Sequence, residues 1–323
     1  MAGSKSDESR DGVALTHLDQ PLFEGAGVTK RQLVDYLDGV RDRIIPELRD
    51  RPLSVIRVTG GQAPFMQKNV PKYTPDWVAT VPLWAEASKR TVSYALCNDR
   101  RTLLWFANQR AVEFHPTLAR VDRLDHATHL VLDLDPPSAD DFPAAVAAAH
   151  LVRRALTDVG LAGAVKTSGA KGLHVIVPID ANVPVEDAAA ATRALAHRAE
   201  RLDPTTVTTA FLKSDRDNKV FLDFTRAGGA TVVAVYSPRA RPGVPVSFPV
   251  GWEALDRIQP ADFTILNALE LLGNADPWAD ALPAPQQLPA DLIAEGHAIP
   301  IARVAAMHEG KRRAKAKRDA GTA

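Results

Sequence analysis

Apolar residues in the first hundred positions recur first at helical spacing and then at strand spacing. After Thr29, one helix face is marked by apolar residues three or four positions apart: Leu33, Leu37, Val40 and Ile44. Thr29 and Gln32 are the residue types of a capping box, which satisfies backbone N–H groups at a helix start, so a helix is predicted directly after Thr29. Residues 53–58 and 91–96 predict strands, and residues 98–109 predict an amphipathic helix.

The middle of the chain has a β-α-β-β-α pattern followed by further strand signals. Residues 129–137 predict a strand that ends at two prolines, because proline cannot continue a central strand. Apolar residues at helical spacing between 146 and 159 then predict a helix that stops at Gly160. The remaining predicted elements are two strands joined by a tight loop, a helix and three strands: 163–167, 173–178, about Val185 to Leu202, 206–211, 219–225 and 231–236. This order predicts an α+β fold and fits a ferredoxin-like or RRM-like core.

The composition allows a sizeable core but predicts no partner. The chain has 323 residues, 46% of them apolar, with 39 basic and 39 acidic residues. The single cysteine, Cys97, excludes an internal disulfide. Residues 1–13 predict a disordered polar tail without a signal peptide, and no apolar run reaches the roughly 20 residues of a membrane helix. A cytoplasmic location without membrane contact is therefore expected.

The C-terminal part differs in composition from the rest. Residues 281–292 are rich in proline and predict a linker or surface strap. Six lysines and arginines follow between positions 311 and 318, so 281–323 is expected to be a Pro-rich strap and a basic tail. Such a tail either adds sequence-independent affinity for DNA or is a solvated, disordered end, and the second is the more common case.

Three aspartates on predicted strands form a candidate metal site. Asp133 and Asp135 are two positions apart on one strand, so both side chains leave the same face, and Leu130, Leu132 and Leu134 face the core. Asp223 is a single acid in an apolar strand, where an unpaired carboxylate is costly. Three carboxylates on neighbouring strands suit two Mg²⁺ or Mn²⁺ ions, as phosphoryl transfer requires. An Asp-x-Asp pair taken alone is more often a loop or edge feature.

Two further segments are candidates for binding phosphate. Ser168 and Lys171 lie in the loop SGAKG, whose glycines allow backbone N–H groups to approach an anion, and His174 begins the next strand. Arg239 and Arg241 alternate after another predicted strand and suit bidentate contacts with a triphosphate. The alternatives are a plain tight turn and a solvated edge.

The order of the motifs identifies a family. The chain resembles the polymerase domain of bacterial DNA ligase D, in the archaeo-eukaryotic primase superfamily, of the stand-alone actinobacterial kind. The resemblance covers about residues 15–275 and is carried by these motifs in family order: LTHLD (15–19), GVTK (27–30), FMQK (65–68), EFHP (113–116), HLVLDLDPP (129–137), TSGAKGLHVIVP (167–178), KVFLDF (219–224) and YSPRARPG (236–243).

The resemblance implies a fold and an activity. It implies an α+β fold with an RRM-like catalytic core of the archaeo-eukaryotic primase type and an additional N-terminal α/β subdomain. The catalytic domain would cover 14–280, divided at about 115. The chain would be a DNA-dependent DNA/RNA polymerase that adds nucleotides, preferably ribonucleotides, to a primer 3′-hydroxyl at short gaps or breaks during DNA repair. It would use two Mn²⁺ or Mg²⁺ ions, bind gapped or primed DNA and NTP or dNTP, act as a monomer in association with the nucleoid, and rely on a separate DNA ligase.

The resemblance also implies roles for matching residues. The metal ligands and catalytic residues would be Asp133, Asp135 and Asp223. The nucleotide-binding residues would be His115, Ser168, Lys171, His174, Arg226, Arg239 and Arg241. The DNA-binding residues would be Lys30, which meets a 5′-phosphate, and Phe65, Met66, Gln67 and Lys68, of which the first two pack on template bases.

The chain departs from the family pattern at a few positions. Gln20 stands where a second lysine usually contacts the 5′-phosphate, and Met66 stands where a second aromatic residue is usual. Thr117 replaces a common tryptophan, and Ala227 follows Arg226 where asparagine is usual. All three aspartates are intact, which argues for catalysis. The alternatives are a metal-dependent nuclease and a non-catalytic module that binds DNA gaps and recruits a ligase.

Overall fold

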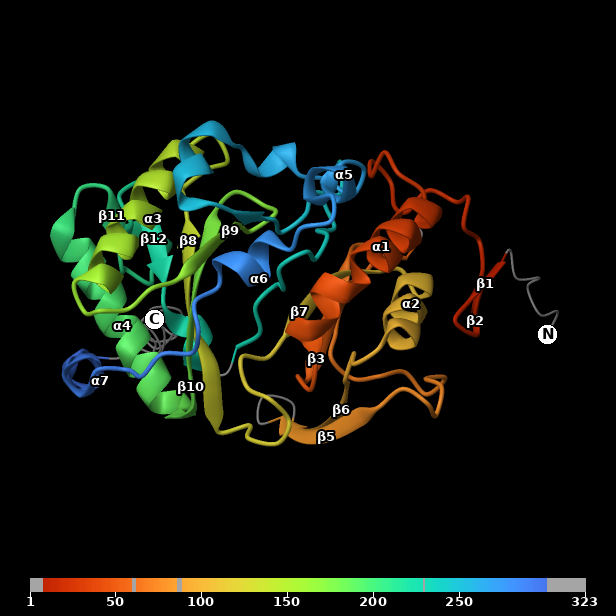
Figure 1. Ribbon diagram of the computed structural model, residues 1–323, viewed down its shortest axis with the longest axis horizontal. Coiled ribbons are helices and arrows are strands. Elements are labelled where there is room, and N and C mark those ends of the chain that lie inside the picture. Colours follow the sequence, from red (N-terminus) through yellow and green to blue (C-terminus); the bar gives the residue numbers. More distant parts are fainter. Residues whose placement is uncertain (1–7, 60–61, 86–88, 229, 301–323) are drawn as a thin grey trace, which may run out of the picture.

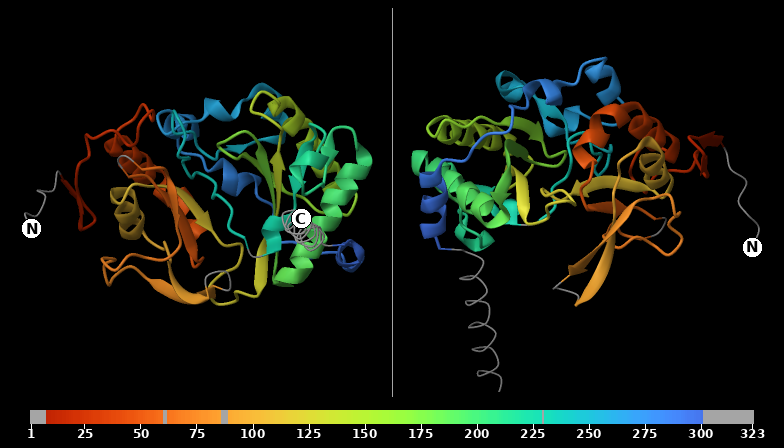
Figure 2. Two further views of the ribbon diagram at one scale, coloured as in Figure 1. Left: turned by 180° about the vertical axis from the view of Figure 1, so that it is seen from behind. Right: turned by 60° about the horizontal axis from the view of Figure 1, so that its bottom comes forward.

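The structure, a computed structural model, describes residues 8–59, 62–85, 89–228 and 230–300. These residues form two lobes that lie side by side, with the N-terminal lobe in red to orange and the second lobe mostly in yellow to green (Figure 1). The same division is visible from behind and from below (Figure 2). The blue segment after about residue 260 runs along the top of both lobes before it reaches the far side of the second lobe.

The N-terminal lobe is a sheet with two helices packed on it. The sheet has the order β4-β3-β6-β5, and β7 also pairs with β3. Its strands are β3 (Leu53–Arg57), β4 (Phe65–Gln67), β5 (Thr80–Ala85), β6 (Arg90–Ala95) and β7 (Ala111–Pro116). The helices α1 (Lys30–Leu48) and α2 (Arg100–Asn108) pack against each other and against β7. The predicted capping box at the start of α1 is confirmed, since Thr29 and Gln32 exchange both hydrogen bonds.

The second lobe is a six-stranded sheet in the order β11-β12-β8-β10-β9-β13. Its strands are β8 (His126–Asp135), β9 (Ala164–Thr167), β10 (Leu173–Pro184), β11 (Val207–Thr208), β12 (Val220–Asp223) and β13 (Pro249–Val250). The helices α3 (Phe142–Thr157) and α4 (Val185–Leu202) connect β8 to β9 and β10 to β11. The order β12-β8-β10-β9 with these two helices is the ferredoxin-like arrangement, so the predicted α+β fold with an RRM-like core is confirmed.

The faces of the six-stranded sheet bury different cores. Leu130, Leu132 and Leu134 of β8 pack with the apolar residues of α3 and α4, which cover the face away from the N-terminal lobe (Figure 1). Val131 of β8 and Ile176 of β10 point to the opposite face and pack into the core of the N-terminal lobe. The two lobes therefore share one continuous apolar core on this face of the sheet. The polar ends of the strands lie next to this core.

The remaining elements pack around this frame. They are the hairpin β1 (Glu8–Arg10) with β2 (Val13–Leu15), the helices α5 (Ala268–Leu272), α6 (Pro277–Ala281) and α7 (Ala290–Ala298), and the short 3-10 helices at Lys213–Asp215, Thr225–Gly228, Trp252–Arg257 and Pro260–Asp262. α7 packs on α4. Across the four described ranges, no helix has the length and apolarity needed to cross a bilayer.

Several predicted elements differ in the structure. The segment 231–236 is not a strand: apart from a single bridge between Thr231 and Thr117 it forms no ladder, and Tyr236 turns it out of the extended conformation with φ of 65°. Its apolar residues are buried between the lobes. The predicted strand 206–211 shortens to β11.

The N-terminal end differs from its predicted character where it is described, and the C-terminal strap contains a helix that was not predicted. Residues 8–10, predicted to lie in a disordered tail, form β1, and Arg10 pairs with Asp35 and Asp38 of α1. Within the expected Pro-rich strap, Gln286 bonds to the backbone of the core lobe and α7 docks on α4. The predicted basic tail at 311–318 lies outside the described residues.

Candidate active site

Four polar residues stand opposite one another across four strands of the six-stranded sheet. Lys166 of β9 faces His174 of β10. His174 in turn faces Asp133 of β8, which faces Asp223 of β12. Directly opposed residues of paired strands project from the same face, so these four side chains form one row, which we call the polar row. Asp135, two positions beyond Asp133, projects from the same face beside it.

A pocket of about 210 Å³ opens above the polar row. Its lining is His115, Asp133, Asp135, Ser168, Ala170, Lys171, His174, Arg226, Thr231, Val232, Val233, Arg239 and Arg241. We call it the central pocket. It gathers all seven residues expected to bind a nucleotide, together with two of the three aspartates expected to bind metal. These residues come from β7, β8, β10, two loops and the 3-10 helix Thr225–Gly228, so only the fold brings them together.

The loop between β9 and β10 is shaped by its two glycines. Gly169 has φ of 65°, and a Cβ on Gly172 would lie 2.0 Å from the carbonyl oxygen of Leu134. The loop therefore packs directly on the end of β8, next to the aspartates. Ser168 Oγ accepts hydrogen bonds from the N–H groups of Ala170 and Gly172, both at 3.2 Å. The two backbone donors are thus used inside the loop, and Ser168 lies at the edge of the central pocket.

Glu113 of β7 contacts two of the residues that are expected to bind the nucleotide, His115 and Arg239. His115 Nε2 lies 2.8 Å from Glu113 Oε2, and the N–H of Ala240 donates to Glu113 Oε1 at 2.9 Å. Arg239 Nε forms an ion pair with Glu113 Oε2 at 3.1 Å, but its N–H makes no hydrogen bond. Arg239 Nη1 also donates to the backbone oxygen of Ser168. The carboxylate thereby ties the arginine segment to the N-terminal lobe, and Arg239 itself ties that segment to the β9–β10 loop.

Charges in the polar row are unequally stabilised. Burial and the neighbouring Lys166 ammonium lower the pKa of His174 to about 4, so the imidazole is neutral at neutral pH. Burial alone would raise the pKa of Asp133, but His174 and Arg226 outweigh it and lower the pKa of this carboxyl. Burial and the adjacent Asp133 raise the pKa of Asp135. The aspartate cluster therefore carries repulsion that a bound cation would relieve.

The donor chemistry of the aspartates fits a hard divalent cation, although no ion is part of the structure. Within the described residues, no three His, Cys, Asp or Glu side chains converge closely enough to hold a metal ion together. Instead, the Arg226 guanidinium lies between two of the aspartates, 3.2 Å from Asp133 Oδ2 and 3.2 Å from Asp223 Oδ2. A cationic group thus already stands between these carboxylates. Oxygen ligands of this kind suit Mg²⁺ or Mn²⁺, so the residues fit the expected group.

The residues expected to bind DNA lie apart from the central pocket. Phe65 and Met66 are 38% and 44% exposed and line a separate groove of about 420 Å³ with Gln67 and Lys68. Lys30 is only 2% exposed, and its ammonium donates to the backbone oxygen of Thr16 at 2.6 Å and to Asn108 Oδ1 at 2.7 Å. In this conformation the Lys30 ammonium faces protein acceptors, and its contact with a 5′-phosphate stays a prediction.

Sequence reasoning missed two residues of this site. Glu113 lies two positions before His115 on β7 and therefore on the same face, which the alternation of a strand would have revealed. Lys166 is a lone charged residue in the short buried strand β9 and is 2% exposed. A charge in an otherwise apolar strand was the only signal for it, because its partner His174 is defined by the register of β9 and β10.

Comparison with known proteins agrees with this geometry. Residues 29–278 match the family model described as LigD, primase-polymerase domain. The chain is 33% identical to the bifunctional non-homologous end joining protein LigD of Bacillus subtilis over 87% of its length, and 32% identical to the multifunctional LigD of Mycolicibacterium smegmatis over 85%. It spans 46% and 36% of these two relatives, less than half of either.

A solved structure resembles most of the chain. The chain superposes on the polymerase domain from Mycobacterium tuberculosis Ligase D in complex with DNA, with a TM-score of 0.76 and 30% sequence identity. The match covers 83% of this chain and 97% of that domain. Both lobes and the polar row fall within the family match, since residues 29–278 include every strand from β3 to β13.

Proposed function

Because the chain belongs to the LigD primase-polymerase domain family, it is a nucleotidyltransferase of the DNA-directed polymerase and primase class, and we propose that it adds nucleotides to a primer 3′-hydroxyl at short gaps or breaks in DNA. We propose further that it prefers ribonucleotides, uses two Mn²⁺ or Mg²⁺ ions, and acts in DNA repair, including end joining. The relatives named as end-joining proteins support the repair role. A DNA ligase that seals the product is the expected partner.

One observation carries the proposal: the central pocket brings cationic and aspartate side chains into one space. Lys171, Arg239 and Arg241 line it together with Asp133 and Asp135. A triphosphate needs the cations, and a reacting hydroxyl needs the carboxylates with their metal ions. A nuclease needs no cradle for a triphosphate, so this combination favours nucleotidyl transfer over hydrolysis.

The reaction would form a bond between the primer 3′-oxygen and the α-phosphorus of the nucleotide and release pyrophosphate. Asp133, Asp135 and Asp223 would hold the divalent ions, which when bound lower the pKa of the hydroxyl and neutralise phosphate charge. The chain's own cations position the triphosphate oxygens, and the Ser168 hydroxyl donates to them. Catalysis by these residues is mainly alignment and electrostatic stabilisation.

The groove on the N-terminal lobe is the proposed site for template bases. Phe65 and Met66 offer exposed apolar surface to a base, and Arg57 lies over the Phe65 ring at 5.9 Å from its centroid. Base stacking on such side chains tolerates any sequence, as a repair polymerase requires. Lys68 at the same edge adds a charge for the phosphate backbone.

Recognition of a 5′-phosphate is expected to be weak in this chain. Gln20 stands next to Lys30, because the N–H of Lys30 donates to the Gln20 backbone oxygen at 2.9 Å. Arg110 Nη2 donates to the Gln20 side-chain oxygen at 2.9 Å, so one cation is near this point. The missing lysine charge and the burial of the Lys30 ammonium both reduce the attraction for a phosphate.

Primer extension on a short-gapped duplex tests the proposal. Wild type, Asp133→Asn and the matched surface control Asp140→Asn are compared with Mn²⁺ or Mg²⁺ and with each rNTP and dNTP. We expect templated addition by wild type and Asp140→Asn, loss of at least about 100-fold in Asp133→Asn, and faster use of rNTP. The Asn change keeps shape while removing one charge, and circular dichroism checks the fold.

Other outcomes point elsewhere. Shortening of the strands by wild type without added nucleotide would support a nuclease. Equal rates of nucleotide addition by Asp133→Asn and wild type would show that the polar row takes no part in the reaction. Equal rates with rNTP and dNTP would end the proposed ribonucleotide preference and leave the polymerase proposal standing.

A further inference from the structure

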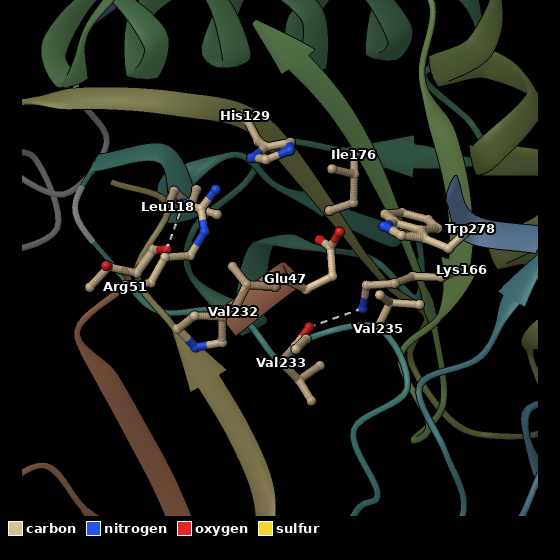
Figure 3. Close-up of a pocket in the computed structure, with 13 residues that line it drawn as sticks. Glu47, Arg51, Leu118, His129, Lys166, Ile176, Val232, Val233, Val235 and Trp278 are labelled. Atoms are coloured by element: carbon tan, nitrogen blue, oxygen red, sulfur yellow. Dashed lines mark hydrogen bonds between the residues drawn. The ribbon is translucent and has the colours of Figure 1, made fainter. Parts of the chain in front are cut away.

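Lys166 is a buried lysine with a complete set of hydrogen-bond partners and no expected role. Its Nζ lies 2.8 Å from His174 Nδ1, 2.6 Å from Ser247 Oγ and 3.1 Å from the backbone oxygen of Val233. Figure 3 shows it at one side of a small cavity between the lobes, its ammonium turned to the Val233 carbonyl, with Arg51 on the other side of the cavity. The cavity, about 50 Å³, has room for only a few water molecules.

Matching each hydrogen-bond donor with an acceptor assigns the protons along the polar row. Val233 offers only a carbonyl, and Ser247 Oγ donates its own proton to the Thr167 backbone oxygen at 2.8 Å. Both therefore accept from Lys166, which uses two of its three N–H bonds. The third N–H of an ammonium points to His174 Nδ1, which must then accept.

The contact of the other imidazole nitrogen, Nε2, leads to the same assignment of protons. His174 Nε2 lies 3.3 Å from Asp133 Oδ1, and an ionised carboxylate can only accept. The proton of a neutral imidazole therefore belongs on Nε2, which leaves Nδ1 as the acceptor that Lys166 requires. Beside a neutral imidazole, an uncharged lysine would have to accept from Nδ1–H, and His174 Nε2 and Asp133 would then face each other with lone pairs. The row is self-consistent as ammonium, Nε2–H imidazole and carboxylate.

We propose that Lys166 is a positioning residue that holds His174 in the Nε2–H tautomer and fixes its ring orientation, so that the imidazole presents a donor and not a lone pair to Asp133 and to the central pocket, which both residues line. The part of this inference that concerns nucleotide rests on the proposed function. A donor at this position attracts the oxygens of a phosphate, whereas a lone pair repels them. The tautomer of a histidine is commonly set by the partner of its other nitrogen.

A purely structural role for Lys166 predicts something different. Its contacts with Ser247 and Val233 tie β9 to two neighbouring segments, and any loss of these contacts lowers stability without selecting a tautomer. Ser247→Ala removes one of these contacts and leaves the contact with His174 intact, which makes it the matched control. Lys166→Met removes all donors at similar length, and Lys166→Arg restores donors.

The test combines histidine NMR with nucleotide binding. Protein with ¹⁵N-labelled histidine is studied as wild type, Lys166→Met, Lys166→Arg and Ser247→Ala, with the His174 signals assigned from His174→Gln. We expect Nε2–H alone in wild type and Ser247→Ala, a mixture of tautomers in Lys166→Met, and partial recovery in Lys166→Arg. Equilibrium binding of a non-hydrolysable NTP analogue should weaken about tenfold in Lys166→Met, and less in Lys166→Arg.

The outcomes separate this inference from the proposed function. An Nδ1–H signal for His174 in wild type overturns the inference without any variant, so it stays testable even where Lys166→Met fails to fold. A single Nε2–H tautomer and unchanged affinity in Lys166→Met also overturn it. If the tautomer changes as expected but wild type binds no nucleotide, the positioning role stands and the proposed function fails.

Discussion

Replacing Glu113 by glutamine tests whether a buried carboxylate holds the nucleotide-binding side chains in place. Glu113 is 5% exposed and contacts His115, Arg239 and the N–H of Ala240. Burial alone would raise its pKa, but the hydrogen bond from His115 and the charge of Arg239 outweigh burial and lower the pKa to about 2 from an ordinary 4.5. The variant keeps the shape but turns an amide N–H₂ toward Arg239.

The pKa difference gives the size of the effect. At about 1.4 kcal/mol per pH unit, it corresponds to about 3 kcal/mol favouring the ionised folded state, and breaking one side of a buried ion pair has a similar cost. We therefore expect Glu113→Gln to lower the free energy of unfolding by about 2–3 kcal/mol at pH 7. Nucleotide affinity should fall about tenfold, because Arg239 loses its anchor on β7.

The pH dependence gives a second signature. A carboxyl whose folded-state pKa is lowered contributes stability that is complete above the unfolded pKa and is lost as pH falls toward the folded pKa. The difference between wild type and Glu113→Gln should be constant from pH 6 to 8 and shrink by about 1 kcal/mol between pH 7 and pH 4. Only below the folded pKa of about 2 does the side chain at position 113 become neutral in folded wild type as well.

Urea unfolding at pH 7 and pH 4 provides the measurement, with Glu24→Gln as the control. Glu24 is exposed in a loop, so the same chemical change there should alter the free energy of unfolding by less than about 0.5 kcal/mol. Equal unfolding free energies for Glu113→Gln and Glu24→Gln at pH 7 would refute the reasoning. A difference that stays the same at pH 4 would refute its electrostatic part.

The other predictions concern three separate parts of the chain. Gly172→Ala places a Cβ 2.0 Å from the Leu134 oxygen and should cost more than about 2 kcal/mol in urea unfolding, whereas Gly251→Ala, which meets nothing within 4 Å, should not. Burial and nearby Arg51 lower the pKa of His129 to about 3, so the free energy of unfolding falls as pH drops below about 6.5. Because His129 keeps some exposure, we expect the His129→Gln variant to lose about 1–2 kcal/mol less than wild type on going to pH 5. Gln20→Lys should increase the preference for gaps with a 5′-phosphate about tenfold in a binding assay.

Each of these has a contrary result. Equal unfolding of the two glycine variants would show that the β9–β10 loop can move away from β8 at little cost. Identical acid sensitivity of wild type and His129→Gln would place the acid-labile groups elsewhere. A Gln20→Lys variant that binds both kinds of gap equally would mean that this part of the N-terminal lobe does not approach the 5′-phosphate.

Local patterns in the sequence determined the elements and their faces. The capping residues before α1 and the alternation along β8 act through neighbouring dihedral angles and side-chain direction, so they are readable without the fold. That alternation placed Asp133 and Asp135 on one face and the leucines on the other, as the structure has them. The ordered motifs also identified the family, which the comparisons confirm.

The tertiary structure alone decided which of these residues meet. The polar row depends on the registers of three strand pairs, which distant segments set when they pair and which no local pattern contains. Glu113 gained its role only when a segment more than a hundred positions away packed on β7. The run 231–236 has the composition of a strand, but burial between the lobes outweighed its strand propensity. Local preferences act over a few residues, whereas a site is assembled by contacts between segments that only the compact chain brings together.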